Sequence, residues 1–139
     1  MRHLLCFLLL GVAACAKNRD DVLQEKPVAK KIEWHVHASG HPNEPWLDAM
    51  QAQVQIHLYK IDTLNKTTQT LWDTTFASRT LRNYPGLPQK LLVEKQVLHL
   101  KREKLQVWYN IRYEMNGNAS EMGRMDQAQK PFTFIDVKL

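Results

Sequence analysis

The chain has 139 residues, of which 44% are hydrophobic, 24% charged and 9% aromatic. These values are typical of a single globular domain, and they argue against wholesale disorder or a coiled coil. Nineteen Lys and Arg residues against fourteen Asp and Glu residues give a formal net charge of +5. No run of basic residues exceeds two, so the charge is not concentrated as it is in nucleic-acid-binding proteins, and we expect no nucleic-acid partner.

The N-terminus has the organisation of a secretory signal peptide. Met1-Arg2-His3 carries positive charge and is followed by an apolar stretch from Leu4 to Ala14. This stretch is too short to cross a bilayer, which takes about 20 residues, but it fits the hydrophobic region of a signal peptide. We therefore predict that residues 1–14 are removed from the mature protein.

Cys15 is predicted to carry a lipid. The run Val12-Ala13-Ala14-Cys15 resembles the lipobox of bacterial lipoproteins, in which the cysteine thiol takes a diacylglycerol and cleavage falls just before it. Ala14-Cys15-Ala16 also fits the cleavage pattern of an ordinary signal peptide, which would leave a soluble secreted protein. Cys6 would leave with the signal, so the mature chain would contain no disulfide. Because residue 16 is not Asp, resemblance to enterobacterial lipoproteins implies the outer membrane, facing the periplasm.

Residues 15–31 are predicted to form the lipidated cysteine and a flexible tether, because they are rich in charge and poor in apolar periodicity. From Ile32 the polarity alternates with a period of two, which is typical of half-buried strands separated by turns. The expected strands cover residues 32–38, 52–58, 70–76, 89–95, 105–114, 119–124 and 132–139. Residues 32–139 are thus predicted to form an all-β domain, a small antiparallel β-sandwich of about seven strands.

Three local features complete this prediction. Asn116-Gly117 is a strong hairpin signal, since both residues tolerate a positive φ. Residues 93–104 fit a helix as well as a strand, and we favour a strand that ends near Lys95 followed by an irregular link. Phe134 and Ile135 interrupt the alternation of the last strand, so we predict a β-bulge there.

The stretch from Leu105 to Gly117, LQVWYNIRYEMNG, together with the lipobox and the small all-β domain, resembles the YscW-type pilotin lipoproteins of type III secretion. A broader set of lipoproteins of the YbaY kind shares the strand and the glycine hairpin. The resemblance implies a chaperone that binds the C-terminal segment of a secretin subunit and promotes its outer-membrane targeting and assembly. It supplies no catalytic residues, and the functional position that it transfers is Cys15.

Three residues are candidates for contact with a partner. Trp108 is expected on the polar face of the 105–114 strand, where it is either a binding anchor or covered by a loop. Met122 and Met125 are expected to cluster with Met115 near the hairpin, and methionine-rich surfaces suit adaptable protein contacts, although such clusters also bind Cu(I) or fill a core. The partner could enter a hydrophobic groove or add to a sheet edge.

The sequence gives little evidence of a catalytic site. The chain has no Gly-x-Ser-x-Gly, no phosphate-binding glycine loop and no His-Glu-x-x-His. We therefore expect a protein that is not an enzyme and has no cofactor besides the covalent lipid. One alternative is a periplasmic metal-binding lipoprotein that holds Zn²⁺ or Cu²⁺ through His35, His37 and His41, or copper through the methionines. A generic envelope lipoprotein without a secretin partner is another.

Overall fold

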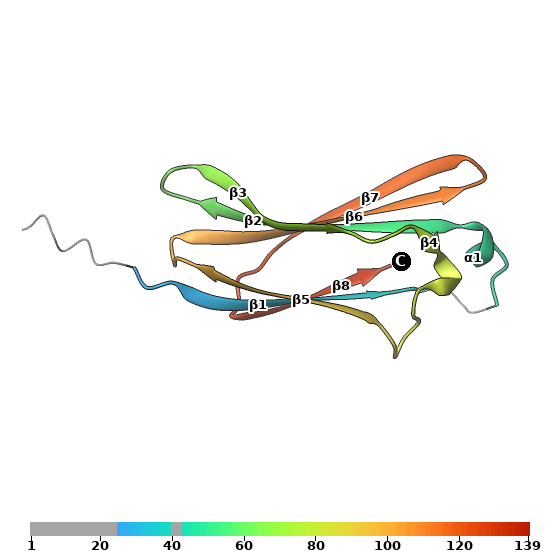
Figure 1. Ribbon diagram of the computed structural model, residues 1–139, viewed down its shortest axis with the longest axis horizontal. Coiled ribbons are helices and arrows are strands. Elements are labelled where there is room, and N and C mark those ends of the chain that lie inside the picture. Colours follow the sequence, from blue (N-terminus) through green and yellow to red (C-terminus); the bar gives the residue numbers. More distant parts are fainter. Residues whose placement is uncertain (1–24, 40–42) are drawn as a thin grey trace, which may run out of the picture.

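Two β-sheets packed face to face make up the domain (Figure 1). The computed structural model describes residues 25–39 and 43–139, so the predicted signal peptide, Cys15, most of the tether and His41 lie outside the described residues. The three-stranded sheet has the order β5-β1-β8, and the five-stranded sheet has the order β3-β2-β6-β7 with β4 paired to β2. The elements are β1 (Val28–His37), α1 (Trp46–Ala49), β2 (Gln51–Asp62), β3 (Thr67–Thr75), β4 (Arg79–Thr80), η1 (Leu81–Asn83), β5 (Leu91–His99), β6 (Glu103–Met115), β7 (Asn118–Gln127) and β8 (Phe132–Lys138).

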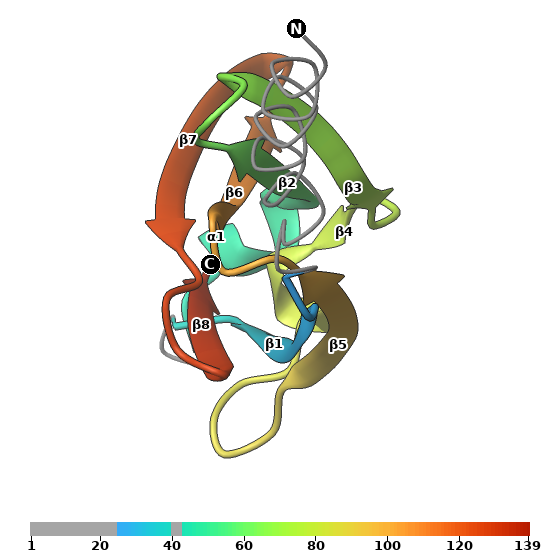
Figure 2. The ribbon, with the colours of Figure 1, turned by 90° about the vertical axis from the view of Figure 1, so that its left-hand side faces the viewer.

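This architecture confirms the predicted small all-β sandwich. Viewed along the strands, the two layers lie one above the other, with β7 and β3 at the two sides of the larger sheet (Figure 2). Within the described part of the chain, no helix is long and apolar enough to span a membrane.

The core lies between the sheets and consists of every second residue of the central strands. Each sheet turns one face inward because side chains alternate along a strand. Trp34 on β1 is fully buried, as are Ile56 on β2 and Ile111 on β6. The core residues with no exposed surface are Ile32, Trp34, Val36, Ala52, Val54, Ile56, Leu58, Val107, Ile111 and Val137. The periodicity in the sequence therefore marks the buried face correctly.

The first strand begins earlier than predicted. The sequence suggests a start at Ile32, but β1 begins at Val28, which pairs with His99 of β5. Residues 28–31 include two lysines and resemble the rest of the predicted tether in charge. They nevertheless pair antiparallel with residues 96–99 of β5. The end of the predicted tether is thus part of the sheet.

The open question about residues 93–104 is settled in favour of a strand, and that strand is longer than expected. It does not end near Lys95: β5 continues to His99, and a turn at residues 100–102 leads into β6 at Glu103. Exposure alternates along the whole of β5, with Val93 and Val97 packed against the core. The two valines suit the strand and the helix equally in sequence, and pairing with β1 decides between them.

The predicted bulge at Phe134 and Ile135 is wrong. β8 pairs with β1 in continuous register, and Phe134 lies on the outer face while Ile135 is buried. Phe134 breaks the pattern in sequence because it is an aromatic residue on the exposed face. The register shift that the structure does contain lies between Leu58 and Tyr59, where β2 pairs with β3. The β1–β8 pair is parallel, whereas the other pairs of named strands in the described residues are antiparallel.

The hairpin between β6 and β7 forms where Asn116-Gly117 predicts it. Asn116 has a φ of 52° and Gly117 a φ of 78°. We expect Gly117→Ala to lower the free energy of unfolding by about 1–2 kcal/mol, because a Cβ is disfavoured at this backbone conformation. Gly86→Ala is the control, since neither glycine has an atom within 4 Å of a built Cβ and only Gly117 has a positive φ. Equal effects of the two variants in urea unfolding would contradict the strain argument.

Candidate functional site

Trp108 lies at the centre of a row of side chains on the outer face of the five-stranded sheet. The pairing places it opposite His57 of β2 on one side and Met125 of β7 on the other. The Trp108 and His57 rings stack with their centroids 4.8 Å apart, and His57 in turn stacks with Tyr59 at 6.0 Å. We call Tyr59, His57, Trp108 and Met125 the aromatic row.

Trp108 lies close to the sheet because β7 has a glycine beside it. A Cβ built on Gly123 would lie 3.1 Å from Nε1 of Trp108, so a larger residue would force the ring to move. His57 of β2 and Gly123 of β7 are two neighbours of the Trp108 ring. Gln106 on β6 donates a hydrogen bond to the sulfur of Met125. The indole is held in place and remains partly exposed.

The two candidate methionines of β7 point to opposite faces of the sheet. Met125 pairs with Trp108 on the outer face, whereas Met122 pairs with Ile111, whose side chain points into the sandwich. Both remain exposed, Met122 to 49% and Met125 to 58%. They do not form the predicted cluster, because an odd spacing in a strand reverses the face. They instead place one exposed thioether on each face of β7.

β7 itself is an open edge strand. It runs from Asn118 to Gln127, and β6 is its one partner among the described strands. Every residue of β7 is exposed except Asp126, which is half-buried. Figures 1 and 2 show β7 at the side of the sandwich, next to β6. The backbone groups on its free side therefore have no strand to pair with.

The two described histidines of the predicted metal site have different partners. Lys90 Nζ donates to His35 Nδ1 (2.8 Å), and His35 Nε2 donates to Glu33 (3.2 Å). Hydrogen bonds from Lys31 and then from His35 hold the pKa of Glu33 below its ordinary value. His37 is buried, and its Nε2 donates to Asp136 at 2.8 Å. The described part of the chain contains no group of three His, Cys, Asp or Glu residues suited to a metal ion.

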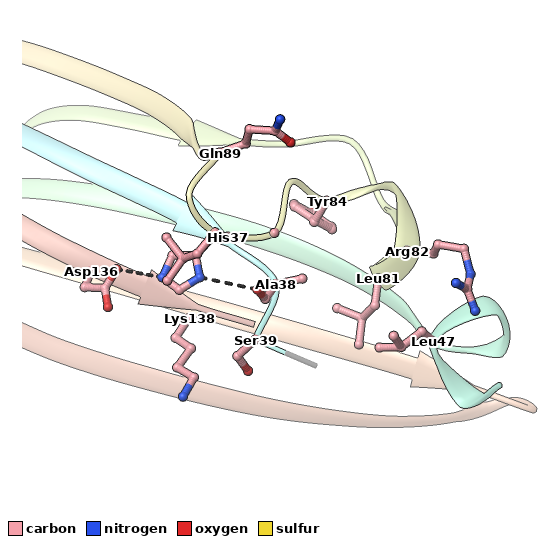
Figure 3. Close-up of a pocket in the computed structure, with 12 residues that line it drawn as sticks. His37, Ala38, Ser39, Leu47, Leu81, Arg82, Tyr84, Gln89, Asp136 and Lys138 are labelled. Atoms are coloured by element: carbon pink, nitrogen blue, oxygen red, sulfur yellow. Dashed lines mark hydrogen bonds and ion pairs between the residues drawn. The ribbon is translucent and has the colours of Figure 1, made fainter. Parts of the chain in front are cut away.

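A hollow that the sequence does not predict lies at one end of the sandwich (Figure 3). Its volume is about 610 Å³, within the range of ligand pockets. It is bounded by α1, by residues 81–89 and by the ends of β1 and β8, including the His37–Asp136 pair. Tyr84 in its wall donates to the Ala52 carbonyl oxygen (3.1 Å), and burial raises the pKa of this tyrosine. The end of β1 and α1 are neighbours in sequence, but residues 81–89 and β8 are far from them, and no spacing pattern connects the segments.

Scans of the chain against protein-family models, curated proteins and solved structures each return no match. Its function must therefore be inferred from the arrangement of its own residues.

Proposed function

We propose that this protein is a pilotin-type chaperone, a non-catalytic lipoprotein anchored in the outer membrane through Cys15. It binds the C-terminal segment of a type III secretion secretin and promotes the targeting and assembly of that subunit. The resemblance of the lipobox and of residues 105–117 to pilotin lipoproteins supports the proposal. The observation that carries it is β7, an open edge strand with an exposed methionine on each face.

An open edge strand binds an extended peptide by pairing with its backbone. A secretin segment that adds to β7 would place alternate side chains on the two faces of the sheet. Those on the outer face would lie beside Met125 and the aromatic row, and those on the inner face would lie beside Met122. Backbone pairing would supply affinity, and the two methionines would accept apolar side chains of varied shape.

Trp108 is the expected anchor on the outer face. Tryptophan is enriched among the residues that dominate binding energy, and a rigid, pre-positioned ring loses little conformational entropy on binding. Stacking on His57 and the space above Gly123 supply that positioning.

The proposed chaperone activity combines two effects on the secretin subunit: its exposed surface is covered, and it is held at the membrane. A secretin subunit exposes apolar surface and strand edges before assembly, and both promote aggregation. Pairing with β7 would cover one such edge. A lipid anchor on the chaperone would also raise the concentration of the subunit at the membrane.

The test is a calorimetric titration of the purified protein with the C-terminal peptide of a secretin from the same cell. We expect saturable binding with a Kd in the micromolar range or tighter. Trp108→Ala should weaken it about 30-fold, corresponding to the roughly 2 kcal/mol of a binding anchor. The double variant Met122→Ala/Met125→Ala should weaken it about 10-fold or more. Hydrogen exchange of the amides of residues 118–127 should slow when the peptide is bound.

β5, another edge strand, provides a matched control. β5 carries Leu92 and Leu98, which are 51% and 65% exposed, so Leu92→Ala/Leu98→Ala removes a comparable apolar pair. Leu87→Ala tests the end hollow, whose wall includes this exposed leucine. If the β7 and Trp108 variants still bind the peptide and either control variant does not, the peptide contacts the surface of that control and not β7. Absence of binding by the folded protein would favour a generic envelope lipoprotein.

A further inference from the structure

A second hollow lies at the end of the sandwich where residues 25–27 lead into β1. The turn between β5 and β6 and the start of β1 meet at this end (Figure 1). The hollow has a volume of about 270 Å³, and Lys30, Lys101 and Lys104 line it together with His99. It shares no residue with the aromatic row or with the hollow around His37, and it shares only Gln127 with β7.

Lys30 is an unusually buried cation. Its side chain points inward with Ile32 and Trp34, and the residue is only 6% exposed. Its ammonium donates to the Ala128 carbonyl oxygen and forms no ion pair with a carboxylate in the described residues. An ammonium has three donors, so further donor capacity remains here. Burial lowers the pKa of Lys30, as expected for a cation without a counter-charge.

The carboxylate in the wall of this hollow is already paired elsewhere. Glu103 accepts a hydrogen bond from the Leu100 amide (2.7 Å) and forms an ion pair with Lys60 (3.1 Å). Its charge is therefore balanced by a lysine that does not line the hollow. The positive charge of the three lysines in the hollow remains uncompensated by the wall.

His99 adds an unpartnered polar atom to the same wall. Its Nδ1 donates to the Leu100 carbonyl oxygen at 2.8 Å. Its Nε2 is buried and has no hydrogen-bond partner among the described residues. Because Nδ1 is the donor, Nε2 of the neutral ring is an acceptor, and His99 is therefore not counted among the phosphate ligands.

We propose that this hollow binds a phosphate group through Lys30, Lys101 and Lys104. Lysine is a common phosphate ligand because its ammonium is a compact charge with several donors. The phosphate could belong to a lipid headgroup or be free. Cys15 and Glu25 are ten positions apart and can be separated by at most about 36 Å, so a lipid on Cys15 would hold this end near the membrane. The lipid on Cys15 bears only on whether the phosphate belongs to a lipid headgroup. The phosphate site itself does not depend on the proposed binding of a secretin.

The test compares melting temperatures of the intact mature protein in phosphate and in chloride at equal ionic strength. We expect saturating phosphate to raise the melting temperature by about 4 °C or more. Lys101→Gln/Lys104→Gln should abolish the rise, because two of the three lysines that line the hollow lose their charge. Lys66→Gln/Lys130→Gln is the matched control, since it removes two exposed lysines that do not line the hollow. An absent rise, or an equal loss in both double variants, would overturn the site.

A second arm identifies the source of the phosphate. The same proteins are mixed with vesicles of phosphatidylcholine alone or with added phosphatidylglycerol. A further rise with phosphatidylglycerol that Lys101→Gln/Lys104→Gln removes would assign the site to a lipid headgroup. A response to free phosphate without a response to vesicles would assign it to a soluble phosphate. Failure of the secretin titration would leave either result unchanged, because β7 and this hollow share no residue other than Gln127 at the strand end.

Discussion

Replacing Trp34 by alanine is expected to lower the free energy of unfolding by about 3–5 kcal/mol, the range for a large aromatic side chain in a packed core. Trp34 lies on β1, the central strand of the smaller sheet, and no part of it is exposed. Its ring packs against Trp72 of the larger sheet, with centroids 5.5 Å apart at an interplanar angle of 44°. The substitution would therefore leave a cavity between the two sheets. A loss of this size is a large part of the 5–15 kcal/mol typical of a domain.

Urea unfolding followed by circular dichroism measures this loss, and two variants calibrate it. Trp46→Ala is the control, because Trp46 on α1 is 42% exposed, and it should cost less than about 1 kcal/mol. Trp34→Phe should cost clearly less than Trp34→Ala. It keeps an aromatic ring and removes an indole N–H that is buried without a partner among the described residues. Equal stability of Trp34→Ala and Trp46→Ala would contradict the packing of the two sheets described here.

The sequence predicts the strands of this domain well because each strand has one buried face. Ile32, Trp34 and Val36 alternate with polar residues, and the structure buries all three completely. The long alternation from Leu105 to Tyr113 likewise becomes β6, which pairs with both β2 and β7. Short-range turn chemistry is equally readable, as Asn116-Gly117 shows.

Pairing between segments that are distant in sequence cannot be predicted in the same way. The parallel contact of β1 with β8 joins residues about a hundred positions apart, and nothing local in either strand indicates it. Lys30 shows the consequence for single residues. Its charge is typical of a tether, but the pairing of β1 with β5 turns it inward at the end of the core. The basic hollow therefore cannot be predicted from the sequence without knowing how the strands pair.

The candidate contact residues are a mixed case. Trp108 lies on the outer face, as its position between Val107 and Tyr109 predicts. Met122 and Met125 lie on opposite faces of β7 because they are three positions apart in a strand. The predicted cluster took their closeness in sequence into account but not this alternation. The openness of β7 could not be predicted, because whether a strand is central or at an edge depends on the whole sheet.

Replacing Cys15 by serine is expected to remove lipid attachment completely. In a bacterial host, the wild-type protein should incorporate radiolabelled palmitate and sediment with the outer membrane. Cys15→Ser should incorporate none and disappear from that fraction, because a hydroxyl does not replace the thiol that takes the diacylglycerol. Several acyl chains on one residue give stable attachment, whereas a single chain gives marginal, reversible binding. The effect should therefore be close to all or none.

Cys6→Ser is the matched control, because Cys6 is the one other cysteine of the chain and lies within the predicted signal peptide. The Cys6 variant should keep both the label and the membrane location. A wild-type protein that takes no palmitate and is recovered in the soluble periplasmic fraction would instead identify an ordinary signal peptide. The secretin segment could still bind β7 in that case, but the protein could not carry it to the membrane through a lipid. Anchoring and binding are thus separable, and the proposed pilotin function requires both.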